Sequence, residues 1–60
     1  MSADSLKERI RSLEGIIAGY QQSLRLAKTD HEKSQYEKFI SNTENEISGL
    51  RRELKASYGQ

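Results

Sequence analysis

The sequence predicts an all-α fold, an antiparallel hairpin of two helices that pack in the manner of a coiled coil. Charged residues make up 32% of the 60-residue chain, which has four glycines and neither proline nor cysteine, a composition typical of long helices. Apolar residues recur at alternating spacings of four and three along two stretches, and a helix-start pattern precedes each stretch. We therefore interpret residues 1–60 as a single helical-hairpin domain.

The first helix is expected over about residues 5–28. Ser5-Leu6-Lys7-Glu8 is typical of a capping box, in which the serine hydroxyl accepts from the third helical amide and the glutamate bonds back to the serine amide. The apolar seam of this helix, the line of residues expected to face the other helix, consists of Leu6, Ile10, Leu13, Ile17, Tyr20, Leu24 and Ala27. This spacing predicts a helix that is covered along one face.

A turn is expected at about residues 29–31, followed by a second helix over about residues 31–57. The run Thr29-Asp30-His31-Glu32 is a second capping-box pattern, with Thr29 or Asp30 as the cap, and an uninterrupted helix would have no use for one. The seam of the second helix consists of Tyr36, Ile40, Thr43, Ile47, Leu50, Leu54 and Ser57.

The two seams stay in register when the chain turns near residue 30, because an antiparallel hairpin then pairs positions whose numbers add to 60. Leu13 faces Ile47 under this rule, and Thr43 faces Ile17. A hydroxyl opposite an apolar side chain predicts a weak layer. Replacing Thr43 with valine or isoleucine is therefore expected to raise stability by about 1 kcal/mol if the hydroxyl has no good partner.

One broad side of the predicted hairpin carries mostly small and weakly polar side chains, and we name it the apolar flank. Its members are Ile16, Gly19, Ser23, Phe39, Asn42 and Glu46. Ile16 and Phe39 would lie in water in a single hairpin, and a glycine inside a helix costs roughly 0.8 to 1 kcal/mol against alanine. We expect this flank to form a homodimer interface that joins two hairpins into a four-helix bundle. The alternative is that the glycines occupy ordinary surface positions.

A hairpin of this size has few other means of stabilisation. Apolar residues make up 33% of the chain, which is near the lower limit for independent folding at this length. The absence of cysteine excludes both a disulfide framework and a zinc knuckle. Oligomerisation is the means that remains.

The opposite side of the hairpin carries charged residues. Four of them, which we name the basic flank, gather at the open end of the hairpin, where the first helix begins and the second ends: Lys7, Arg11, Arg51 and Lys55. Ion pairs across the helices are expected between Glu14 and Arg51 and between Arg25 and Glu37. Such cations bind phosphates in some proteins, and in others they only complement the helix dipole and hold water.

Catalytic, metal and cofactor sites are not expected. His31 is the one histidine and belongs to the turn region, so the chain offers no serine, histidine and acid arrangement. Asp30 and Glu32 beside it point in different directions, whereas a structural metal site needs about four convergent ligands. Glycine-rich phosphate loops are missing as well. The sequence thus predicts a protein that is not an enzyme and holds no metal or cofactor.

The charge balance and hydropathy bound the partners and the compartment. Ten basic and nine acidic residues give a net charge of +1, which excludes a polybasic or an acidic tail. No apolar run approaches the 18 or more residues of a membrane span, and the first residues lack the order of a signal peptide. We expect a cytoplasmic protein with no membrane partner.

Our leading hypothesis is a small, non-enzymatic accessory protein that acts through protein-protein contacts as a homodimer, with a protein partner whose identity the sequence does not give. The alternative is a nucleic-acid-binding regulator that uses the basic flank. In outline, a chain of about sixty residues with its turn near the middle is similar to the Rop family of plasmid copy-number regulators, RNA-binding homodimers of two hairpins. The similarity is one of architecture, and no sequence motif or functional residue is transferred with it.

Overall fold

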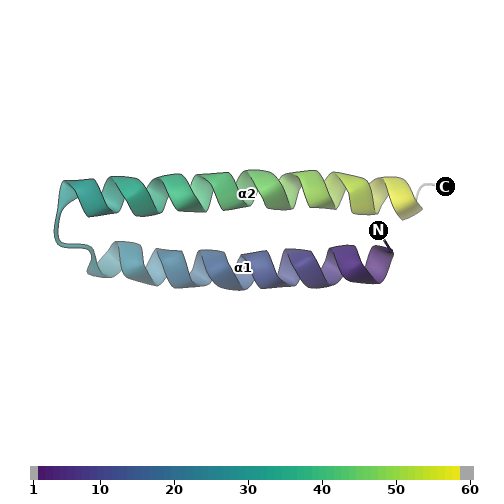
Figure 1. The fold of residues 1–60 in the computed structure, drawn as a ribbon, viewed down its shortest axis with the longest axis horizontal. Coiled ribbons are helices and arrows are strands. Elements are labelled where there is room, and N and C mark those ends of the chain that lie inside the picture. Colours follow the sequence, from purple (N-terminus) through teal and green to yellow (C-terminus); the bar gives the residue numbers. More distant parts are fainter. Residues whose placement is uncertain (1, 59–60) are drawn as a thin grey trace.

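The computed structural model describes residues 2–58, and in this range the chain forms two α-helices. α1 spans Ala3–Leu26 and α2 spans Asp30–Tyr58. The helices lie side by side and run antiparallel, so α1 begins at the same end of the molecule at which α2 ends (Figure 1). The expected all-α hairpin is confirmed, and residues 2–58 contain no strand.

α1 begins two residues earlier than the sequence pattern indicates, because Ser2 is its cap. The Ser2 backbone is extended, its Oγ accepts a hydrogen bond from the Ser5 amide at 3.2 Å, and its carbonyl accepts from the Leu6 amide at 3.0 Å. Ser5 therefore already lies in the first turn, and the prediction of a capping box from Ser5 to Glu8 is wrong. A serine cap stabilises a helix by about 1 kcal/mol, and Asp4 adds favourable negative charge to this turn.

A three-residue connection, from Ala27 to Thr29, joins the helices. Ala27 is extended and its amide donates to the Leu24 carbonyl at 3.2 Å, so α1 ends at Leu26, two residues before its expected end. Thr29 Oγ1 accepts a hydrogen bond from the Glu32 amide at 3.1 Å, which confirms the expected cap of the second helix. α2 extends one residue beyond its expected bounds at each end.

The core follows the predicted seam. Among residues 2–58, the buried apolar side chains are Leu6, Ile10, Leu13 and Ile47. Ile17, Leu50 and Leu54 are half-buried against the cluster that Ile10, Leu13 and Ile47 form. Every predicted seam residue except Ser57 is buried or half-buried, so the four-three spacing identified the packed face of both helices correctly.

The packing is tighter in the half of the hairpin near the open end than in the half near the turn. Leu6, Ile10, Leu13 and Ile47 all belong to the open half. Between residues 14 and 46 no side chain is buried, and the seam residues of this turn half are only half-buried. One end of the molecule thus has a core of its own, and the other end does not.

The hairpin is a rod. Its extents are 47 × 14 × 12 Å and its radius of gyration is 14.0 Å, whereas a compact domain of this length has a radius of about 10 Å. The accessible surface area is 4764 Å², against about 4000 Å² for a compact monomer of the same mass. Within the part of the chain that the structure describes, neither helix combines the length and apolarity needed to cross a membrane.

Candidate interaction surfaces

The apolar flank contains an aromatic cluster in the turn half. The Phe39 ring on α2 stacks on the Tyr20 ring of α1 with 5.4 Å between centroids and 26° between planes. Tyr36 also approaches Tyr20, with centroids 6.3 Å apart. Despite this contact, 45% of the Phe39 surface is exposed, and Ile16, one turn before Tyr20 on α1, is 46% exposed. The two large residues expected to lie in water in a single hairpin do so.

The other members of the apolar flank are also accessible. Gly19, Asn42 and Glu46 are exposed, and Ser23 is half-buried. Leu26, at the end of α1 and further round the helix, is 71% exposed. The exposed apolar surface of this flank therefore comes from Ile16 and Phe39, and its one charged member, Glu46, lies on the side toward the open end.

A charged pair marks the polar end of this flank. Arg9 Nη2 lies 3.2 Å from Glu46 Oε1, and the two side chains are 53% and 47% exposed. Arg9 was missed in the sequence analysis, although it precedes Ile16 by seven residues and so occupies the same heptad position. Because the pair is exposed, it contributes about 0 to 1 kcal/mol.

The helical glycines are not needed for the approach of α1 to α2. A Cβ atom built on Gly15, Gly19 or Gly49 would meet nothing within 4 Å. The free-energy cost of placing glycine in a helix at these positions is therefore not offset by contacts inside the hairpin. Any packing role for them involves a second molecule.

The hydroxyl of Thr43 has a partner within its own helix. Its Oγ1 donates a hydrogen bond of 2.7 Å to the carbonyl of Phe39, one turn earlier in α2. The condition under which valine was expected to add about 1 kcal/mol is therefore not met, because the pattern of seam residues ignores bonds that a threonine makes to its own helix.

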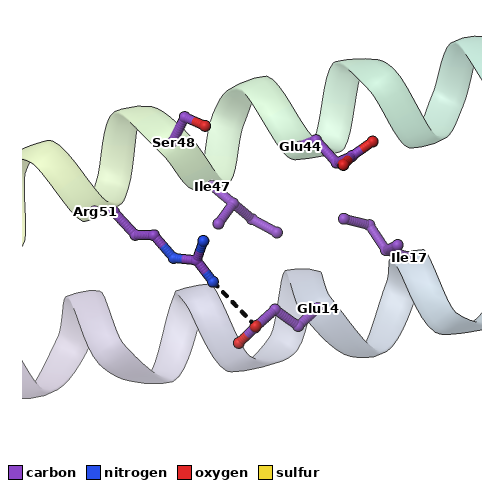
Figure 2. Close-up of a pocket in the computed structure, with 6 residues that line it drawn as sticks. All are labelled: Glu14, Ile17, Glu44, Ile47, Ser48 and Arg51. Atoms are coloured by element: carbon purple, nitrogen blue, oxygen red, sulfur yellow. Dashed lines mark hydrogen bonds and ion pairs between the residues drawn. The ribbon is translucent and has the colours of Figure 1, made fainter.

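The basic flank is partly neutralised. Arg51 reaches across from α2 to α1, where its Nη2 lies 3.2 Å from Glu14 Oε2, as the sequence predicted (Figure 2). Within residues 2–58, no ion pair joins Arg25 to Glu37, so that prediction is wrong.

A second member of the basic flank, Lys7, contacts an aromatic side chain. The Lys7 Nζ lies 5.2 Å from the centroid of the Tyr58 ring. Hydrogen bonding and charge interaction with Tyr58 raise the pKa of Lys7 above its ordinary value of 10.5. Arg11 and Lys55, the remaining members, are exposed. Two of the four cations are thus engaged within the hairpin itself.

A shallow groove of about 310 Å³ opens between the helices beside this flank. It is lined by Glu14, Ile17, Glu44, Ile47, Ser48 and Arg51. Figure 2 shows Ile17 and Ile47 between the helices, with the pair of Arg51 and Glu14 to one side of them. The groove therefore has an apolar floor and a charged rim.

The arrangement of titratable groups offers no convergent set. Among residues 2–58, no three histidine, cysteine, aspartate or glutamate side chains come together in a way that could hold a metal ion. His31 is exposed in the first turn of α2, whereas the sequence analysis assigned it to the turn region between the helices. The features that remain for molecular recognition are the apolar flank and the basic flank.

Comparison of the chain with models of known protein families, with curated proteins and with solved structures found no match. The similarity in outline to the Rop family therefore has no support from these comparisons.

Proposed function

We propose that the chain is a small, non-catalytic interaction protein that forms a homodimer through its apolar flank and presents its remaining helix faces to a protein partner. One observation carries the proposal: Ile16 and Phe39 leave almost half of their surface in water, and the Phe39 ring stacks on Tyr20, one turn after Ile16 on α1. Covering that face with a second hairpin would make a four-helix bundle.

The surface area supports a partner of the same size. The hairpin exposes about 750 Å² more than a compact monomer of its mass. A standard-size interface buries about 800 Å² on each partner. Forming a dimer through one broad face would therefore bury about as much surface on each hairpin as the hairpin exposes in excess of a compact monomer.

The small core of the hairpin also supports a homodimer. With four buried side chains among the described residues, the hairpin has little apolar burial to offset the ordering of its backbone. A second copy enlarges the buried area without lengthening the chain. We also propose that the protein works in the cytoplasm, and the near balance of ten basic and nine acidic residues is compatible with that compartment.

The proposal is tested by the mass of the protein in solution. Light scattering at micromolar concentration should report about twice the 6.9 kDa of the chain. Phe39→Glu should dissociate or unfold the dimer, because burying an unpaired carboxylate costs more than the apolar contact it replaces. Tyr58→Glu is the matched control, since Tyr58 is a 61% exposed aromatic residue that contacts Lys7 on the basic flank. A helical monomer, or a Phe39→Glu variant that keeps the full dimer mass, would contradict the proposal.

The second candidate is a nucleic-acid-binding regulator that uses the basic flank. Arg11 and Lys55 are exposed at the open end and favour it. It ranks second because Arg51 is paired with Glu14 and Lys7 contacts Tyr58, so that half of the cations already have a partner.

A further inference from the structure

The two halves of the apolar flank differ in chemistry. The turn half carries the exposed apolar surface, formed by Ile16 and Phe39 beside the half-buried Tyr20. Toward the open end, Arg9 of the open half pairs with Glu46, which lies near the middle of α2 at the boundary between the halves. A second hairpin can meet this pattern in two ways, with its turn at the same end or at the opposite end.

We propose that the two hairpins of the dimer lie side by side with both turns at the same end. The proposal rests on the homodimer proposed above and adds its orientation. The two-fold axis then runs along the length of the bundle, so that each half of the apolar flank faces the same half of the second copy.

The apolar contacts favour this orientation. With the turns together, Ile16, Tyr20 and Phe39 of both copies form one apolar cluster in the half of the molecule that has no buried side chain of its own. Each square ångström of apolar surface removed from water stabilises the bundle by roughly 25 cal/mol. The second copy thus supplies the core that the turn half lacks.

The charges favour the same orientation. With the turns at opposite ends, the rings of Phe39 and Tyr20 would cover the ion pair of Arg9 and Glu46, and both charges would lose water without gaining a partner. With the turns together, this pair meets the same pair of the second copy, and each charge gains a neighbour of opposite sign. In the single hairpin Arg9 lies toward the open end and Glu46 near the middle of α2, and their side chains are 53% and 47% exposed.

The helix directions are compatible with this packing. A two-fold axis along the bundle places α1 of one copy beside α2 of the other. Because α1 and α2 run antiparallel in each hairpin, all four neighbouring helix pairs are then antiparallel, which aligns their dipoles favourably.

The orientation can be measured with spin labels, because the chain contains no cysteine that would compete for the label. Lys28→Cys places a label in the connection between the helices, and Ala56→Cys places one near the end of α2. Both positions are exposed. Circular dichroism and light scattering on each labelled variant check that it remains helical and dimeric, and dilution with unlabelled chain removes any signal that arises between the two copies.

Pulsed dipolar spectroscopy on these two variants should report short distances between copies in both. Labels at the same end of a four-helix bundle are separated by at most about two helix diameters, or about 25 Å. Turns at opposite ends would give distances close to the 47 Å length of the hairpin for both labels. A short Lys28→Cys distance with a long Ala56→Cys distance would mean an end-to-end contact. Either of these two results in a protein of dimer mass overturns the orientation and leaves the homodimer standing, whereas a monomer overturns both.

Discussion

Phe39 stacks on Tyr20 at 5.4 Å between ring centroids, yet it remains 45% exposed in the hairpin. The cost of removing the Phe39 ring therefore depends on whether a second copy covers it. An aromatic pair contributes about 0.5 to 1.5 kcal/mol beyond its buried area, whereas deleting a fully buried phenylalanine costs about 3 to 5 kcal/mol.

We expect Phe39→Ala to lower the free energy of unfolding by about 3 kcal/mol per chain at micromolar concentration, measured by urea denaturation. The unfolding midpoint should also rise with protein concentration in the wild type, since unfolding is linked to dissociation. Tyr58→Ala is the control and should cost less than about 1 kcal/mol, because it removes only an exposed cation-π contact with Lys7. A loss near 1 kcal/mol for Phe39→Ala, independent of concentration, would mean that only the stack with Tyr20 is lost.

The register of the hairpin could be predicted because it depends on local periodicity and on one turn. Leu13 and Ile47 lie in one cluster, as the rule that paired positions add to 60 requires. The start of α1 could not be predicted in the same way. The residue three positions after Ser2 is Ser5, not a glutamate, so the capping-box pattern favours the wrong serine. A helix cap depends on a few local hydrogen bonds, so it leaves a weaker signal in the sequence than the seven seam positions of a helix do.

The candidate surfaces could be predicted from the sequence only in part. Heptad spacing placed Ile16 and Phe39 on one flank and predicted the pair of Glu14 with Arg51. It did not predict that the buried core would be confined to the open half, because burial depends on how large residues such as Tyr20 fit between the helices. The orientation of two copies follows from that asymmetry and not from the spacing.

Gly15 and Gly19 form a matched pair that tests the interface without introducing charge. A Cβ atom at either position meets nothing within the hairpin, so alanine should gain roughly 0.8 to 1 kcal/mol of helix propensity at both. Gly19 belongs to the apolar flank, where an added methyl group would enter the dimer interface. We expect Gly15→Ala to raise the urea midpoint of the dimer and Gly19→Ala to leave it unchanged or lower it. Equal gains at both positions would show that Gly19 faces only water.

The hydrogen bond from Thr43 to the Phe39 carbonyl changes the expected effect of valine at this position. Thr43→Val keeps the shape of the side chain and loses a bond that competes with the helix ladder, while it gains apolar burial. We expect the free energy of unfolding to change by less than about 0.5 kcal/mol, instead of rising by about 1 kcal/mol. Thr43→Ser keeps the hydroxyl and removes the methyl group, and should cost about 0.4 kcal/mol, half the value of a fully buried methylene, because Thr43 is half-buried. Thermal unfolding of the two variants separates the contribution of the hydroxyl from that of the methyl group. A clear loss of stability in Thr43→Val would mean that the hydroxyl contributes more than the methyl group.

The basic flank distinguishes the two proposed classes of function through the salt dependence of binding. If the basic flank binds a nucleic-acid duplex, the logarithm of the affinity should fall with the logarithm of salt concentration, with a slope of roughly −0.9 per phosphate neutralised on B-DNA. The double variant Arg11→Gln and Arg51→Gln should flatten this slope. The control is Arg25→Gln with Lys33→Gln, which removes the same charge near the turn.

The structure adds a variant that should strengthen such binding. Glu14→Gln releases Arg51 from its 3.2 Å ion pair and removes a negative charge beside the basic flank, so a phosphate-binding flank should gain affinity from it. We expect instead that wild type and Glu14→Gln both bind duplex DNA and RNA hairpins weakly at 150 mM salt, because Lys7 already contacts Tyr58 and few cations are left to neutralise phosphates. Fluorescence anisotropy with labelled oligonucleotides measures this directly. Sub-micromolar binding that strengthens in Glu14→Gln and disappears in the Arg11 and Arg51 double variant, but not in its control, would place the nucleic-acid function ahead of the protein-interaction function.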